Sequence, residues 1–106
     1  MPDLEDDRKA LSRLCDRLRS TSERRLTRAD DRLSGGSVAD AVHQAASWAA
    51  AAQGVDRQVP RLHPLASADQ LSVVGSDFLD WVASGDGRGA DLEEWRASVE
   101  RIRAVV

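Results

Sequence analysis

Residues 91–106 read DLEEWRASVERIRAVV, and the apolar positions in this stretch decide the fold. They recur at three-four-three-four spacing, which places them on one stripe of an α-helix: Leu92, Trp95, Val99, Ile102 and Val106. Asp91 stands before this stripe as an acidic N-cap, with Glu94 three residues later, close to a capping box. The segment predicts an amphipathic helix whose apolar side must be covered by other helices.

Three earlier segments carry the same signal. Residues 4–19 have an apolar stripe, with acidic residues in the first turn and arginines in the last, as the helix dipole favours. Residues 38–52 follow Ser37, a good N-cap, and end before Gly54. Ser67 is predicted to cap a helix that runs to residue 84. The connection 55–66 contains two prolines and cannot be helical throughout.

Residues 20–36 form a longer, partly ordered connection in this reading. Residues 22–26 favour a short helical turn, Leu26 and Leu33 are its large apolar anchors, and Gly35-Gly36 ends it. The prediction is therefore one all-α domain over residues 1–106, a four-helix bundle with room for a short extra helical turn between the first two helices. The short connection before residue 91 predicts that the last two helices are antiparallel neighbours.

Composition agrees with this fold class and bears on location. Sixteen of the 106 residues are alanine, the best helix former, whereas strand-forming residues are sparse. Cys15 is the sole cysteine, so no disulfide can form within the chain, and a reducing compartment is the natural setting. The acidic N-terminus lacks an apolar signal core, and no run approaches the length of a membrane span. We expect a cytoplasmic protein without a membrane partner.

Residues that could carry chemistry are few. Cys15 lies on an apolar stripe, as a small core residue would, and His43 lies beside one, at the boundary with solvent. Asp77 and Asp80 share a helix face and could hold a cation if a third ligand arrived, but the Glu-x-x-His pairing of di-metal bundles is missing. We expect no enzyme, catalytic residue, metal or cofactor. The alternative is a small metal- or ligand-binding protein or enzyme with a pocket near His63, Asp77 and Asp80.

Charge is divided unevenly along the chain. Residues 8–32 hold nine basic and four acidic residues, whereas residues 69–100 hold eight acidic and two basic ones. The Arg-rich segment 8–32 could bind phosphate backbones, which makes a nucleic-acid-associated protein a second alternative. The net charge of −3 and the acidic third helix argue against that alternative. The two halves could equally attract each other within the fold or between copies.

One run resembles a stretch of a known group. Residues 68–79 read ADQLSVVGSDFL and are similar to the DQL-x-V-x-G-x-D run of small uncharacterised actinobacterial proteins. The resemblance covers about residues 38–83, and it implies a helical fold in an actinobacterial cytoplasm. It brings no activity, so it assigns no functional residue.

The leading expectation is a non-enzymatic interaction protein that binds another protein or itself, for example as a homodimer. The contact residues proposed from sequence are polar or aromatic positions beside the core stripes: Asp69, Gln70, Gly75, Asp77 and Trp95. Gly75 lies inside the third helix, where glycine weakens a helix, so close packing is expected there. The three tryptophans are either core anchors or, where partly exposed, parts of an interface.

Overall fold

The computed structural model describes residues 4–54 and 58–106, and every regular element in these ranges is helical. The elements are α1 (Glu5–Arg19), α2 (Glu23–Thr27), η1 (Asp31–Leu33), α3 (Val38–Ala52), η2 (Pro64–Ala66), α4 (Ser67–Ala83) and α5 (Gly89–Arg103), where η marks a 3₁₀ turn. The prediction of an all-α fold is confirmed. Residues 1–3 and 55–57, which hold part of the acidic N-terminus and part of the predicted proline-containing connection, lie outside the described residues.

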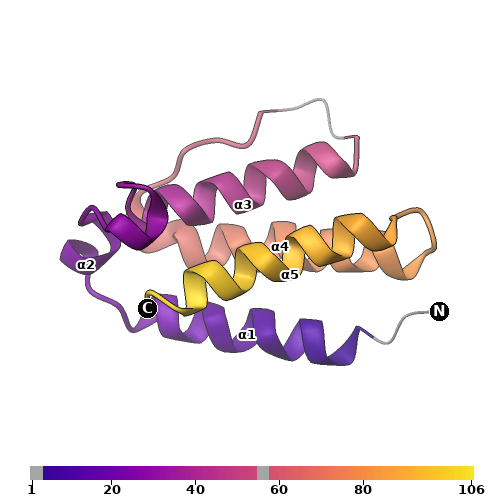
Figure 1. Ribbon diagram of the computed structural model, residues 1–106, viewed down its shortest axis with the longest axis horizontal. Coiled ribbons are helices and arrows are strands. Elements are labelled where there is room, and N and C mark those ends of the chain that lie inside the picture. The colour runs from indigo at the N-terminus through magenta and orange to yellow at the C-terminus, as the bar shows by residue number, and fades with distance from the viewer. Residues whose placement is uncertain (1–3, 55–57) are drawn as a thin grey trace.

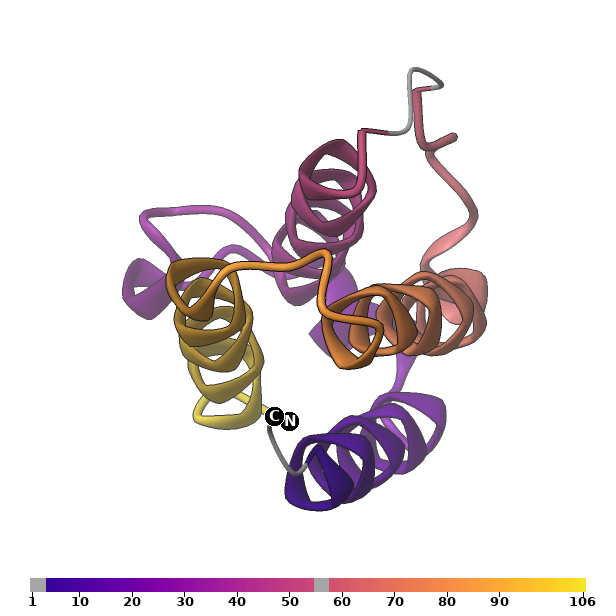
Figure 2. The same cartoon turned by 90° about the vertical axis from the view of Figure 1, so that its right-hand side faces the viewer.

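Four long helices surround one apolar core (Figure 1). α4 packs on α1 and α3, and α5 packs on the same two helices, so α4 and α5 face each other diagonally (Figure 2). The prediction that the last two helices are neighbours is therefore wrong. Residues 84–88 form a connection that crosses the end of the helices instead of turning tightly between two adjacent ones. Large side chains in the core keep α4 and α5 apart.

Aromatic rings fill the space between those two helices. The ring of Phe78 on α4 lies 5.2 Å from that of Trp95 on α5, 5.4 Å from that of Trp48 and 5.9 Å from that of Trp81, measured between centroids. Trp95 is 1% exposed, so it is a core anchor. Trp48 and Trp81 are half-buried and keep part of their rings in solvent.

Gly75 makes room for this arrangement. A Cβ atom at this position would lie 2.8 Å from the Leu11 side chain of α1 and 2.8 Å from the indole of Trp95. The expected close packing is present, and it is made by side chains that reach α4 from both α1 and α5. A methyl group at this position would force a core side chain to move, so only glycine fits the packing as it stands.

Of the three N-caps predicted for α3, α4 and α5, the structure contains one at the predicted residue. Ser37 caps α3 as predicted: its hydroxyl accepts from the Asp40 backbone N–H at 3.1 Å, and the Asp40 carboxylate accepts from that of Ser37 at 3.0 Å. α5 begins at Gly89, two residues before the predicted cap, and the Asp91 carboxylate accepts instead from the backbone N–H of Arg88. Ser67 lies inside α4, because η2 leads directly into that helix.

The short helical turn predicted between the first two long helices is confirmed as α2. Ser22 caps it, and Leu26 is 1% exposed against the core. η1 follows, and Leu33 packs on the edge of the core. Residues 20–36 therefore close one end of the molecule.

Candidate functional site

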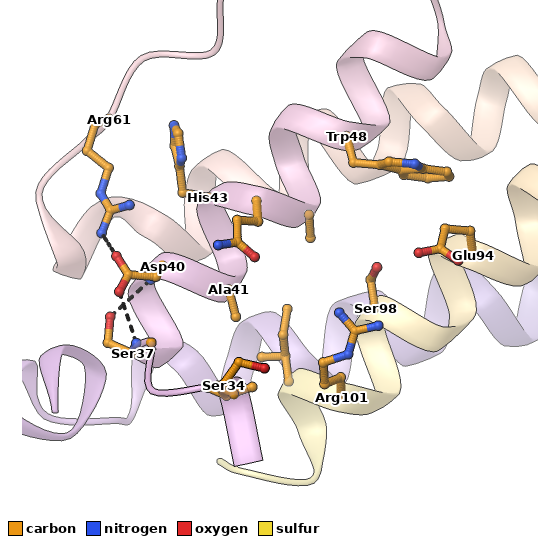
Figure 3. Close-up of a pocket in the computed structure, with 15 residues that line it drawn as sticks. Ser34, Ser37, Asp40, Ala41, His43, Trp48, Arg61, Glu94, Ser98 and Arg101 are labelled. Carbon is orange, nitrogen blue, oxygen red and sulfur yellow. Dashed lines mark hydrogen bonds and ion pairs between the residues drawn. The ribbon is translucent and has the colours of Figure 1, made fainter. Parts of the chain in front are cut away.

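A groove open to solvent lies between α3 and α5, with a volume of about 560 Å³ (Figure 3). We call it the α3/α5 groove. It is lined by Leu33, Ser34, Gly36, Ser37, Asp40, Ala41, His43, Gln44, Ala45, Trp48, Arg61, Glu94, Ser98, Arg101 and Ile102. The volume lies within the range of about 300–1,000 Å³ that binding sites occupy in proteins.

Small side chains create the groove. Ala41 and Ala45 line it from α3 and Ser98 lines it from α5, so neither helix projects a bulky residue into the space at these positions. Trp48 lies over one end and Ile102 contributes an apolar part of the floor. A partner would therefore meet a few apolar and small side chains within a lining that is mostly polar.

The rim carries polar groups that the fold does not use. Gln44, Glu94 and Arg101 are exposed, and neither Glu94 nor Arg101 forms an ion pair with any residue in the described ranges. Ser98 is 9% exposed, and its hydroxyl makes no hydrogen bond within the described part of the chain. Figure 3 shows that hydroxyl pointing into the groove. Since no buried polar side-chain atom in the described ranges lacks a hydrogen-bond partner, this oxygen is open to the solvent in the groove and accessible to a bound molecule.

One end of the groove is closed by a charged contact. Arg61, on the segment between α3 and α4, forms an ion pair with Asp40. The backbone N–H of Ser37 and the Arg61 guanidinium hold the pKa of Asp40 below its usual value. The same segment is fixed by His43, whose Nε2 lies 3.1 Å from the Val59 carbonyl oxygen. His43 is half-buried at the edge of α3, as the sequence predicted.

A second groove, of about 270 Å³, runs between α1 and α4. It is lined by Arg8, Leu11, Ser12, Cys15, Arg19, Ser72 and Ser76. Ion pairs join its two helices: Arg8 to Asp80 at 2.8 Å and Arg19 to Asp69 at 3.0 Å. Charges along this groove are therefore satisfied within the chain.

Cys15 lies at the bottom of the α1/α4 groove and is 1% exposed. Burial raises the pKa of its thiol to about 11, which keeps the sulfur protonated and unreactive at neutral pH. The prediction of a small core residue is confirmed.

The structure does not bring His63, Asp77 and Asp80 together. His63 precedes η2, where its Nδ1 accepts from the Leu65 backbone N–H and its Nε2 lies 3.3 Å from a carboxylate oxygen of Glu23. Asp80 lies near the far end of α4, about 20 Å further along at the rise of an α-helix. Among residues 4–54 and 58–106, no group of three or more side chains is placed to hold a metal ion.

The contact residues proposed from sequence have different surroundings. Trp95 and Gly75 are buried in the core, so they cannot meet a partner on the folded surface. Asp69 pairs with Arg19, and Gln70 donates from Nε2 to the Pro60 carbonyl oxygen at 2.8 Å. Asp77 is exposed on α4. None of the five lines the α3/α5 groove.

The basic segment and the acidic segment attract each other in part. The two α1–α4 ion pairs join them, whereas the two hydrogen bonds of 2.8 Å from Arg96 of α5 to the Asp7 carboxylate of α1 involve a basic residue of the acidic segment and a carboxylate outside residues 8–32. Arg13, Arg24, Arg25 and Arg28 form no ion pair with the rest of the described chain. The expectation that the charged halves meet within the fold is supported, and nucleic-acid binding by residues 8–32 stays a prediction.

Sequence reasoning missed the α3/α5 groove. Its signal was present in the alanines at positions 41 and 45 and in the exposed Glu94 and Arg101, seven residues apart on one helix face. Predicting the groove also requires knowing that α5 lies beside α3. The predicted hairpin had placed α5 beside α4 instead.

Comparisons with known proteins add no assignment. No protein-family model, no curated protein and no solved structure matches the chain. Within the described ranges, no helix combines the length and apolar character needed to cross a bilayer.

Proposed function

We propose that this chain is a non-enzymatic, cytoplasmic four-helix bundle that binds a helical segment of a protein in its α3/α5 groove. The observation that carries the proposal is the combination of small and apolar side chains from both helices, Ala41, Ala45 and Ile102, with rim groups that have no partner in the described ranges, Gln44, Glu94 and Arg101. Interfaces of this kind bury an apolar centre and keep a polar margin.

The spacing of the rim charges favours a helix over a small molecule. Glu94 and Arg101 are two turns apart, about 10 Å along α5. A helix laid in a groove presents side chains at the same interval, so one incoming helix can meet both charges while its apolar residues reach the floor. The half-buried Trp48 adds an aromatic contact of the type enriched at protein interfaces.

Photo-crosslinking tests this proposal. A photoreactive amino acid in place of Gln44 is expected to capture protein, whereas the same residue in place of the exposed Arg13 on α1 is not. Ala41→Trp fills the groove and is expected to abolish capture at position 44. Ala10→Trp, the matched change on the exposed side of α1, is expected to leave it intact.

The proposal fails if position 44 captures no more protein than position 13. It also fails if Ala41→Trp, shown to be folded by circular dichroism, leaves capture unchanged.

A further inference from the structure

A small pocket lies at the end of the molecule where α2, the last turn of α1 and the residues after α5 meet (Figure 1). Residues 17–32 at this end hold six basic and three acidic residues. The pocket has a volume of about 20 Å³, enough for a group of the size of a water molecule. Three of the side chains that line it are arginines, Arg25, Arg28 and Arg32, and we call it the arginine pocket.

Contacts within the chain hold two walls of the arginine pocket in place. Arg32 forms an ion pair with Asp30 at 2.9 Å, and Arg17 donates from Nη2 to the Val106 carbonyl oxygen at 2.8 Å. Hydrogen bonds from the side chain and backbone of Arg32, together with the charge of Arg28, lower the pKa of Asp30 to about 2. The Asp30 carboxylate is therefore ionised at neutral pH and neutralises Arg32.

Arg25 and Arg28 have no such partner. Both are exposed, and neither side chain forms a hydrogen bond or an ion pair with residues 4–54 or 58–106. Asp30 is the one acidic side chain that lines the arginine pocket, and it is already paired with Arg32. Two positive charges at the mouth of the pocket are therefore not balanced by the part of the chain that the structure describes.

This charge matches a phosphate monoester. Guanidinium groups bind phosphate oxygens through pairs of parallel hydrogen bonds, and a monoester carries a charge of about −1.5 to −2 at neutral pH. Each phosphodiester of a nucleic-acid backbone carries a single charge, and the net charge of −3 on this chain repels a long polyanion. A small phosphate monoester is therefore the better match.

We propose that the arginine pocket binds the phosphate group of a small phosphate monoester, with Arg25 and Arg28 as its ligands and one phosphate oxygen in the pocket. This site is independent of the proposed function, because the arginine pocket shares no lining residue with the α3/α5 groove. Filling that groove with Ala41→Trp is expected to leave phosphate binding unchanged.

Titration of the ¹⁵N-labelled full chain, followed by NMR, tests the ligand class. Glycerol 2-phosphate and inorganic phosphate are both expected to shift the Arg25 and Arg28 signals in the millimolar range. Dimethyl phosphate, a diester with one charge, is expected to bind at least about ten-fold more weakly. Binding of glycerol 2-phosphate is expected to weaken below about pH 6, where the monoester takes up a proton.

Substitution of the arginines tests the site. Arg25→Gln and Arg28→Gln are each expected to weaken the binding of glycerol 2-phosphate by about ten-fold, because each removes charged hydrogen bonds to the phosphate. Arg24→Gln makes the same charge change at an exposed position of α2 that does not line the pocket, so it is expected to leave the affinity within about two-fold. Circular dichroism checks that each variant is folded.

Four outcomes overturn the inference. Arg25 and Arg28 signals that do not shift at tens of millimolar glycerol 2-phosphate exclude the site, and a loss of affinity in Arg24→Gln as large as in the other two variants assigns the binding to net charge. Binding of inorganic phosphate alone excludes the monoester. A single-stranded oligonucleotide that binds more tightly than glycerol 2-phosphate, with an affinity that falls steeply as salt rises, makes this end a nucleic-acid surface instead.

Discussion

The α1/α4 groove and the α3/α5 groove are both lined by small residues, but they differ in whether their charged side chains are paired within the chain. Arg8–Asp80 and Arg19–Asp69 join the two helices of the first, and its buried thiol is held protonated. The second leaves Glu94, Arg101 and Ser98 without partners within the described part of the chain. The charged side chains of the α1/α4 groove are paired with each other and hold two helices together. The α3/α5 groove retains polar side chains that a bound helix would pair with. The pairing of the charged side chains, more than the volume of the groove, therefore distinguishes the groove with a structural role from the candidate binding site.

Trp95→Ala is expected to have the largest effect, because this residue joins the two sides of the molecule. Its indole reaches from α5 to Gly75 on α4, and its loss leaves a large cavity. We expect a loss of about 3–5 kcal/mol in the free energy of unfolding, measured by urea denaturation. The same change at half-buried Trp81 is expected to cost less. Equal losses at the two positions would contradict the central place given to Trp95.

Asp7→Ala is expected to have the next largest effect. The Asp7 side chain is 10% exposed, and its carboxylate accepts two hydrogen bonds from Arg96, which tie α1 to α5. Removing it is expected to cost about 1–2 kcal/mol, less than a fully buried ion pair, because the half-exposed Arg96 regains water. Asp6→Ala, at an exposed neighbouring position, serves as the control. No difference between the two variants would show that the α1–α5 pair contributes nothing.

Asp40→Asn tests the closed end of the α3/α5 groove through pH. The pKa of Asp40 is lowered from 3.8 by the Ser37 backbone N–H and by Arg61, so the ionised form stabilises the native state above that pH. This contribution is lost as the pH falls through the folded-state pKa. The wild type is expected to exceed the variant by about 0.5–1 kcal/mol near neutral pH, and the difference should shrink below about pH 4.

Thermal unfolding of both proteins over a pH series measures this effect. A difference that stays constant down to about pH 2 would assign the stability of Asp40 to packing and not to its charge.

Arg8→Ala and Arg101→Ala give the smallest effects and the sharpest test of the comparison. Arg8 loses an exposed ion pair with Asp80, for which we expect about 0.3 kcal/mol in the unfolding free energy. Arg101 has no ion partner in the described chain, so its removal should leave the stability of the isolated chain unchanged. A double-mutant cycle with Asp80→Ala isolates the Arg8 contribution. A measurable cost for Arg101→Ala at low protein concentration would mean that the α3/α5 rim also serves the fold.

The helices were predictable because their signals are local. The Ser37 capping box and the three-four spacing of the last helix need only neighbouring residues, and both are present in the structure. The start of α5 was misplaced because Asp91 fits both the N-cap and the third helical position of a capping box. Helix ends are commonly uncertain by one or two residues for this reason.

The groove was not predictable in the same way. It depends on α5 lying beside α3, and the short connection had favoured α4 as its neighbour. Phe78 and Trp95 meet across the core in this arrangement, and no local pattern in the sequence reports on such a contact. The unpaired state of Glu94 and Arg101 likewise follows from which charges the fold brings within reach.

Trp48 gives the chain an optical reporter of its own. Its half-buried indole lines the α3/α5 groove, whereas Trp81 and Trp95 do not. Displacement of water from this ring by an incoming helix would shift its fluorescence emission to shorter wavelength, without any attached dye. Because Phe78 contacts all three indoles, Trp48→Phe keeps an aromatic ring in that cluster while removing the signal at the groove. Occupancy of the groove can thus be followed in the unlabelled protein, at concentrations too low for light scattering.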